Sequence, residues 1–136
     1  MKALLASLVV LAAAPPPAWI LRAVPPPIVT WREADVLGTA VPEGIVVSRD
    51  LGVLTVNVVD SRYDPPRIVR QRGVQGSRVR WLRSGRRDGL ARNEIALDVT
   101  ASGRETAYLL RADRRFTLRL VHTLDGNGIR PDAFGG

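Results

Sequence analysis

Residues 44–59, with the sequence GIVVSRDLGVLTVNVV, predict a β-hairpin. Gly44–Ser48 and Val53–Val59 are rich in β-branched residues, which favour strands. The four residues between them, 49–52 (RDLG), include a glycine and suit a hairpin turn. Positions 54, 56 and 58 are apolar and alternate with polar positions 55 and 57, so one face of this strand is predicted to be buried.

The same period-two pattern continues along the chain. Loops that contain glycine separate the segments, and Pro65-Pro66 predicts a turn because proline cannot donate to a sheet ladder. About seven short strands with one apolar face each predict an all-β fold, namely an antiparallel β-sandwich. The only predicted helix lies around Trp31–Leu37. The further predicted strands are Arg67–Arg72, Ser77–Arg83, Glu94–Thr100, Thr106–Arg111 and Phe116–Thr123.

The N-terminus is typical of a secretory signal peptide. Lys2 is followed by an uncharged, largely apolar run that ends in small residues at Ala14. This run is shorter than the about 20 apolar residues that cross a bilayer. We predict a signal peptide over residues 1–14, with residue 18 as the alternative end, and hence a periplasmic or extracellular location. The alternative is a retained N-terminal membrane anchor, which the prolines after residue 14 argue against.

Proline-rich sequence follows the leader. Pro15–Pro17 and Pro25–Pro27 favour an extended spacer, so residues 15–30 are predicted to be a linker and residues 31–136 a β-sandwich domain. The chain has no cysteine, and its core is therefore expected to be stable without disulfides. One His and one Met are too few for a zinc, copper or haem site. We expect no cofactor and no metal.

Positive charge is concentrated in one part of the chain. Residues 62–92 contain ten Arg and two acidic residues, a net charge of +8, whereas residues 23–61 carry a net charge of −3. Residues 93–136 contain six of each sign. The basic residues are nineteen Arg and one Lys, a bias that codon composition in a GC-rich bacterial genome explains. Codon composition does not explain why the arginines cluster.

The cluster predicts an anion-binding face. Guanidinium groups bind phosphate, sulfate and carboxylate groups in a bidentate way. If strands 67–72 and 77–83 pair, several of their arginines share an outward face, whereas Trp81 alternates with them and is expected in the core. The alternative is a solvated face, compensated by acids from other strands. The candidate anion-binding residues are Arg70, Arg72, Arg78, Arg80, Arg83, Arg86 and Arg87.

Four segments resemble a bacterial immunoglobulin-like domain of the invasin type. Val53–Asp60 resembles its V-x-V-x-D strand, and Val74–Trp81 its segment that ends V-x-W. Thr100–Leu109 resembles its glycine turn and following strand, and Phe116–Thr123 its last strand, before Asp125-Gly126. Carboxypeptidase-regulatory-like and transthyretin-like sandwiches share much of this pattern. The resemblance implies an immunoglobulin-like sandwich that acts as a spacer, an adhesin segment or a binding module.

We therefore expect an exported, non-enzymatic interaction module of the envelope or cell surface, with surface proteins, anionic polysaccharide or a wall polymer as partners. One alternative is a structural subunit of an envelope assembly, such as a pilus or secretion apparatus. A second is a small secreted hydrolase that uses His122 with Glu94 or Glu105. The lack of helix-turn-helix and zinc-finger spacing argues against nucleic acid as partner. Asp125–Gly128 begins like a calcium loop, but no glutamate closes it.

Overall fold

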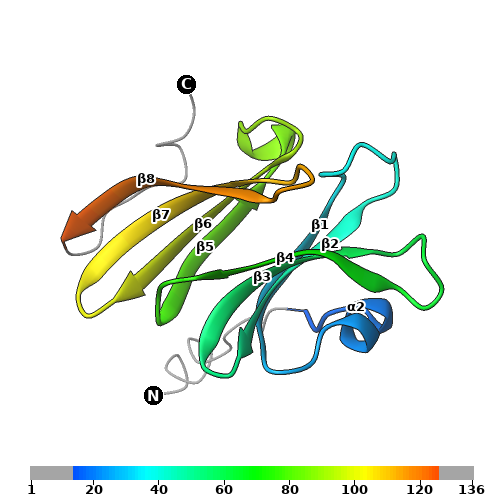
Figure 1. The fold of residues 1–136 in the computed structure, drawn as a ribbon, viewed down its shortest axis with the longest axis horizontal. Coiled ribbons are helices and arrows are strands. Elements are labelled where there is room, and N and C mark those ends of the chain that lie inside the picture. The colour runs from blue at the N-terminus through cyan, green and yellow to red at the C-terminus, as the bar shows by residue number, and fades with distance from the viewer. Residues whose placement is uncertain (1–13, 126–136) are drawn as a thin grey trace, which may run out of the picture.

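The fold consists almost entirely of strands (Figure 1). The computed structural model describes the backbone of residues 14–125 and the side chains of residues 14–117. Within these residues, two antiparallel sheets have the strand orders β1-β2-β3-β4 (the first sheet) and β5-β6-β7-β8 (the second sheet). The predicted all-β sandwich is confirmed. The elements are α2 (Ala18–Ala23), β1 (Ile28–Ala34), β2 (Glu43–Asp50), β3 (Val53–Asp60), β4 (Arg67–Val74), β5 (Arg78–Ser84), the 3-10 turn η1 (Arg86–Asp88), β6 (Glu94–Ala101), β7 (Arg104–Arg111) and β8 (Thr117–Asp125).

Each sheet is a meander, because every strand pairs with the strand next to it in the sequence. The chain passes from one sheet to the other between β4 and β5. An immunoglobulin domain is connected differently, with strands A, B, E and D in one sheet and C, F and G in the other. The two-layer architecture is thus as predicted, whereas the strand order differs from that of the resembled domain.

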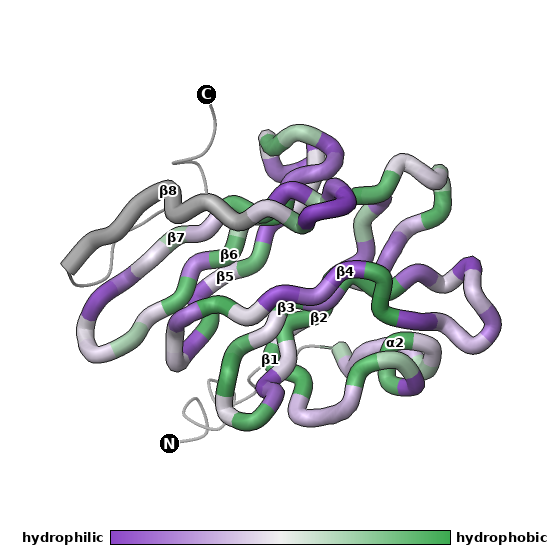
Figure 2. The backbone as a smooth tube through the Cα atoms, viewed as in Figure 1, coloured by the Kyte–Doolittle hydropathy of each residue, from purple (hydrophilic) through white to green (hydrophobic). Residues whose placement is uncertain are grey.

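The main core lies between the two sheets. The hairpin predicted from residues 44–59 forms β2 and β3, with Val47 opposite Val56 and Ile45 opposite Val58. The alternate apolar residues of β3 face the second sheet, as predicted, and Figure 2 shows apolar segments on the strands of both sheets. Burying such side chains is the main source of stability in a domain of this size. The fully buried members of this core include Ile45, Val47, Leu54, Val56, Val58, Ile95, Leu97 and Leu110.

Residues 18–24 belong to the folded body, in contrast to the extended linker predicted for residues 15–30. They form α2 and its C-cap, and Ile20 and Val24 are 0% and 1% exposed. Both pack with Val46 and Val59 on the outer face of the first sheet. Gly44 permits this close approach, since a Cβ there would lie 2.9 Å from Ile20 Cδ1. The prolines flank the helix rather than interrupt it, and for this reason a polyproline spacer was the wrong prediction here.

The helix predicted around Trp31–Leu37 is also wrong. Residues 28–34 form β1, in which Trp31 pairs with Val46 of β2, and a loop follows. In this loop the Asp35 carboxylate accepts hydrogen bonds from the N–H groups of Gly38, Thr39 and Ala40. Pairing with the hairpin therefore overrides the local preference of this segment.

The docking of α2 is tested by two neighbouring substitutions. Ile20→Ala should lower the free energy of unfolding by about 2–5 kcal/mol, because it leaves a cavity under the helix. Leu21→Ala is the control: its side chain is 50% exposed, and the change should cost less than about 0.5 kcal/mol. Equilibrium urea denaturation measures both values. Equal and small effects would show that residues 18–24 do not pack on the sheet.

Candidate anion-binding site

Arginines of the first sheet bridge the two layers of the sandwich. We call Arg32, Arg49, Arg70 and Arg72 the bridging arginines. Each donates to a main-chain carbonyl that follows β4 in the sequence, either in the connection to β5 or in the second sheet and its loops. Arg32 Nη1 lies 2.8 Å from the carbonyl of Leu82, and Arg49 donates to the carbonyl of Ser77. A charged donor makes a stronger hydrogen bond than a neutral one. The bridging arginines thus serve the fold.

Arg70 and Arg72 bridge at the edge formed by β4. Arg70 Nε donates to the carbonyl of Asp113 at 2.6 Å, and Arg72 Nη1 donates to that of Phe116 at 3.1 Å. Both carbonyls lie in the connection between β7 and β8. These two predicted anion-binding residues therefore already have acceptors within the protein.

The shared basic face predicted for residues 67–72 and 77–83 does not form. These segments are β4 and β5, which belong to different sheets and do not pair. Of the seven predicted residues, Arg80, Arg83 and Arg87 line one cleft, and Arg86 lines a smaller cavity beside it. Arg78 is exposed and lines neither of them.

A β-bulge in β5 corrects the predicted position of Trp81. Val79 pairs with Val99 and Trp81 with Asp98, so Arg80 is an extra residue in the strand. A bulge shifts the alternation of side chains by one position. Trp81 consequently packs in the small outer cluster with Leu90, Ala96 and Leu109, while Leu82 takes the core position.

Arg80 lies against two buried acids of the second sheet and pairs with one of them, Glu105. Its Nη1 donates to Glu105 Oε1 and lies 3.6 Å from Asp98 Oδ2, and both carboxylates are 0% exposed. Burial and the neighbouring Glu105 together raise the pKa of Asp98 to about 8, against the attraction of Arg80. The charge of Arg80 is thus largely used within the protein.

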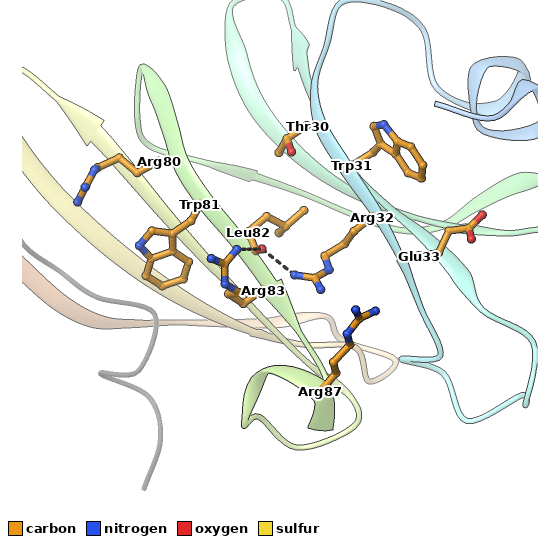
Figure 3. A pocket seen from close by; sticks show the side chains of 9 residues that line it. All are labelled: Thr30, Trp31, Arg32, Glu33, Arg80, Trp81, Leu82, Arg83 and Arg87. Carbon is orange, nitrogen blue, oxygen red and sulfur yellow. Dashed lines mark hydrogen bonds between the residues drawn. The ribbon is translucent and has the colours of Figure 1, made fainter. Parts of the chain in front are cut away.

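A cleft of about 680 Å³ lies between the edge strands β1 and β5 (Figure 3). Residues 30–33 of β1 and residues 80–83 of β5 form its walls, and Arg87 of η1 lines it as well. Figure 3 shows the Arg32 and Arg83 side chains meeting at the carbonyl of Leu82, to which they donate at 2.8 and 3.0 Å. The Arg32 hydrogen bond therefore ties the two strand edges together at one end of the cleft, where two guanidinium groups share an acceptor.

Two cations of this cleft have no acidic partner in the part of the chain that the structure describes. Arg32 is paired with Asp88 at 2.8 Å, whereas Arg83 and Arg87 have no carboxylate within 4.0 Å among the described residues. The Arg83 guanidinium lies 6.0 Å from the centre of the Trp81 ring, in a cation–π contact. The cleft thus combines uncompensated positive charge with an aromatic wall, a combination that suits an anionic ligand.

Sequence reasoning missed the residues of β1 that complete this cleft. Arg32 and Glu33 lie in a segment with net negative charge that was predicted to be helical. Only the folding of β1 against the hairpin brings them opposite β5. Nothing in residues 28–34 alone predicted that they would lie opposite β5, since this position depends on contacts between distant parts of the chain.

Other predictions fall on residues whose side chains lie outside the described part. His122 is placed by its backbone in β8, opposite Ala107, and its side chain is not described. Residues 1–13 and 126–136 also lie outside, with most of the predicted leader and of the Asp125–Gly128 segment. Between residues 14 and 125, no helix is long and apolar enough to cross a membrane. Among the side chains of residues 14–117, no group of three or more metal-ligating residues occurs.

Comparison of the chain with protein-family models, with curated proteins and with solved structures gave no match.

The buried acids of the second sheet predict a pH-dependent stability. The pKa of Asp98 is raised from 3.8 to about 8 in the folded state. The protonated Asp98 therefore makes its full contribution to the free energy of unfolding below about pH 4, and this contribution is lost as the pH rises through 8. Asp98→Asn should therefore raise the urea midpoint relative to the wild type more at pH 8 than at pH 5. Equal shifts at the two pH values would contradict the raised pKa.

Proposed function

We propose that this protein is a non-enzymatic interaction module that binds an anionic polymer in the cleft between β1 and β5. The observation that carries the proposal is the presence of Arg83 and Arg87, without carboxylate partners among the described residues, beside the Trp81 ring. Uncompensated guanidinium groups attract sulfate, phosphate and carboxylate groups and bind them with defined geometry. Arg83 and Arg87 are the residues we assign to ligand contact.

A polymer suits the shape of the site better than a small ion. The cleft follows two strand edges, and a second cavity of about 260 Å³ shares Arg32, Glu33 and Arg87 with it. Successive acidic groups of one chain can therefore meet successive guanidinium groups. An aromatic ring next to these groups offers an apolar face, which fits a sugar ring of an acidic polysaccharide or wall polymer.

The N-terminal sequence supports a ligand outside the cytoplasm. Lys2 and the apolar run to Ala14 are typical of an export signal. Export would place the cleft in the periplasm or outside the cell, where acidic polysaccharides, wall polymers and surface proteins are the available partners. We therefore propose a role at the cell envelope or surface.

The alternative of a subunit that pairs its strand edges with other subunits is less favoured at this edge. The carbonyl of Leu82 accepts from Arg32, and the N–H of Ser84 donates to Asp88 Oδ2 at 2.8 Å. Two main-chain groups that an added strand would need are thus already occupied by side chains. Such occupation protects an edge against pairing and leaves its side chains for a ligand.

Salt-dependent retention of the purified chain on immobilised heparin tests the proposal. Arg83→Glu/Arg87→Glu should elute at clearly lower salt, and its log–log salt slope should be smaller by about 2, as expected for two lost ion contacts. The control is Arg114→Glu/Arg115→Glu, which changes two exposed arginines in the β7–β8 connection by the same charge. Equal elution of the two double variants would show that retention follows net charge and not the cleft.

A further inference from the structure

The cavity beside the cleft has features of a site for one anionic group. It measures about 260 Å³ and lies between η1 and the end of β1. Arg86 and Arg87 line it from η1, and Arg92 lines it from the loop that follows. Ser84, the last residue of β5, lines it as well. Donor groups from β1, β5, η1 and the next loop thus face one small space.

Two donors at this cavity are buried without a partner among the described residues. Ser84 is 2% exposed, and its Oγ has no hydrogen-bond partner. Arg32 Nε is also buried and unpartnered. Buried polar groups are nearly always hydrogen-bonded, so an unsatisfied pair in one place indicates a missing acceptor. Ser84 and Arg32 come from opposite walls, which places that acceptor between them.

Asp88 links the two residues that carry these donors. Its Oδ2 accepts from the main-chain N–H of Ser84 at 2.8 Å and pairs with Arg32 Nη1 at 2.8 Å. Because Arg32 Nη1 also donates to Leu82, the Nε group is left for another acceptor. The site is therefore ordered before a ligand enters, which lowers the entropy cost of binding.

The charge at this cavity favours an anion. Asp88 offsets Arg32, whereas Arg86, Arg87 and Arg92 have no carboxylate within 4.0 Å among the described residues. Asp35 also lines the cavity, but its oxygens accept from the N–H groups of residues 38–40. Glu33 is the other acid of the lining and is exposed. The net charge of the lining remains positive.

Gly38 positions Arg92 over this cavity. Its φ of +77° is a conformation that side chains rarely adopt, and a Cβ there would lie 1.8 Å from Arg92 Nη1. The guanidinium group of Arg92 thus rests on the main chain of the β1–β2 loop, in a place that only glycine leaves free. Arg92, which follows η1 in the sequence, thus places its guanidinium group next to the loop that follows β1.

We infer that this cavity is a subsite for a single tetrahedral oxyanion, namely a sulfate or phosphate monoester group of the bound polymer. The inference rests on the proposed function and narrows its ligand class. Donors that arrive from several elements do not share a plane, and the three terminal oxygens of a monoester accept from more directions than the two coplanar oxygens of a carboxylate. The cleft then holds the polymer, and the cavity selects its sulfated or phosphorylated positions.

Titration of the purified chain with inorganic sulfate and, separately, inorganic phosphate tests the subsite by NMR. Saturable shifts of the Arg32 Nε–H signal and of the main-chain amides of residues 85–92 are expected with at least one of the two ions. Ser84→Ala should weaken that binding by about tenfold or more, because it removes a buried hydrogen bond to a charged group. Ser77→Ala, which changes an exposed serine before β5, is the matched control and should bind as the wild type does.

Arg92→Gln is a second variant, and it replaces Ser84→Ala in the test if Ser84→Ala does not fold. It should also weaken the binding of the inorganic ion. In both variants the loss of affinity for the inorganic ion should exceed any loss of retention on immobilised polyglutamate, which offers carboxylates only. Absence of saturable shifts with both ions, or wild-type affinity in both variants, would overturn the subsite. The proposed function fails separately, if Arg83→Glu/Arg87→Glu and Arg114→Glu/Arg115→Glu elute alike from heparin.

Discussion

The structure depends on hydrogen bonds from arginine side chains of the first sheet to main-chain carbonyls of the β4–β5 connection and of the second sheet and its loops. Two four-stranded meanders leave open edges, where main-chain groups would lack partners. Arg32 supplies a donor at the edge between β1 and β5, and Arg70 and Arg72 supply donors beside β4. The apolar core drives the two sheets together, and the bridging arginines determine how their edges meet.

The basic segment therefore divides into arginines with different roles. Arg70 and Arg72 bridge the sheets, Arg80 pairs with the buried Glu105, and Arg62 pairs with Asp60 at 2.8 Å. Arg83 and Arg87 keep their charge for the cleft, where the proposed polymer binds. Net charge alone would assign all of these residues to one surface. Their acceptors show that much of the charge is used within the fold, and that the proposed binding function rests on a few residues.

Local sequence patterns were sufficient to predict the β-sandwich but not the residues that line the candidate anion-binding site. The β-branched runs in residues 44–59 predicted β2 and β3, and the alternation at positions 54, 56 and 58 predicted the side of β3 that faces the main core, because successive side chains of a strand point to opposite faces. It did not predict the bulge at Arg80, which moves Trp81 out of the core, nor the change of sheet between β4 and β5, which separates Arg72 from Arg78. Both depend on contacts between distant segments. The helix at residues 18–23 is too short for its periodicity to stand out between prolines.

The most direct test of this division is the hydrogen exchange of individual arginine Nε–H groups, measured by NMR on the purified chain. Arg70 Nε donates to the carbonyl of Asp113 at 2.6 Å, whereas the exposed Arg86 and Arg87 have no acceptor among the described residues. The account predicts slow exchange for Arg70 and fast exchange for Arg86 and Arg87 in the absence of ligand. Exchange of Arg70 as fast as that of Arg87 would contradict it, because the sheets would then be held together without the bridging arginines.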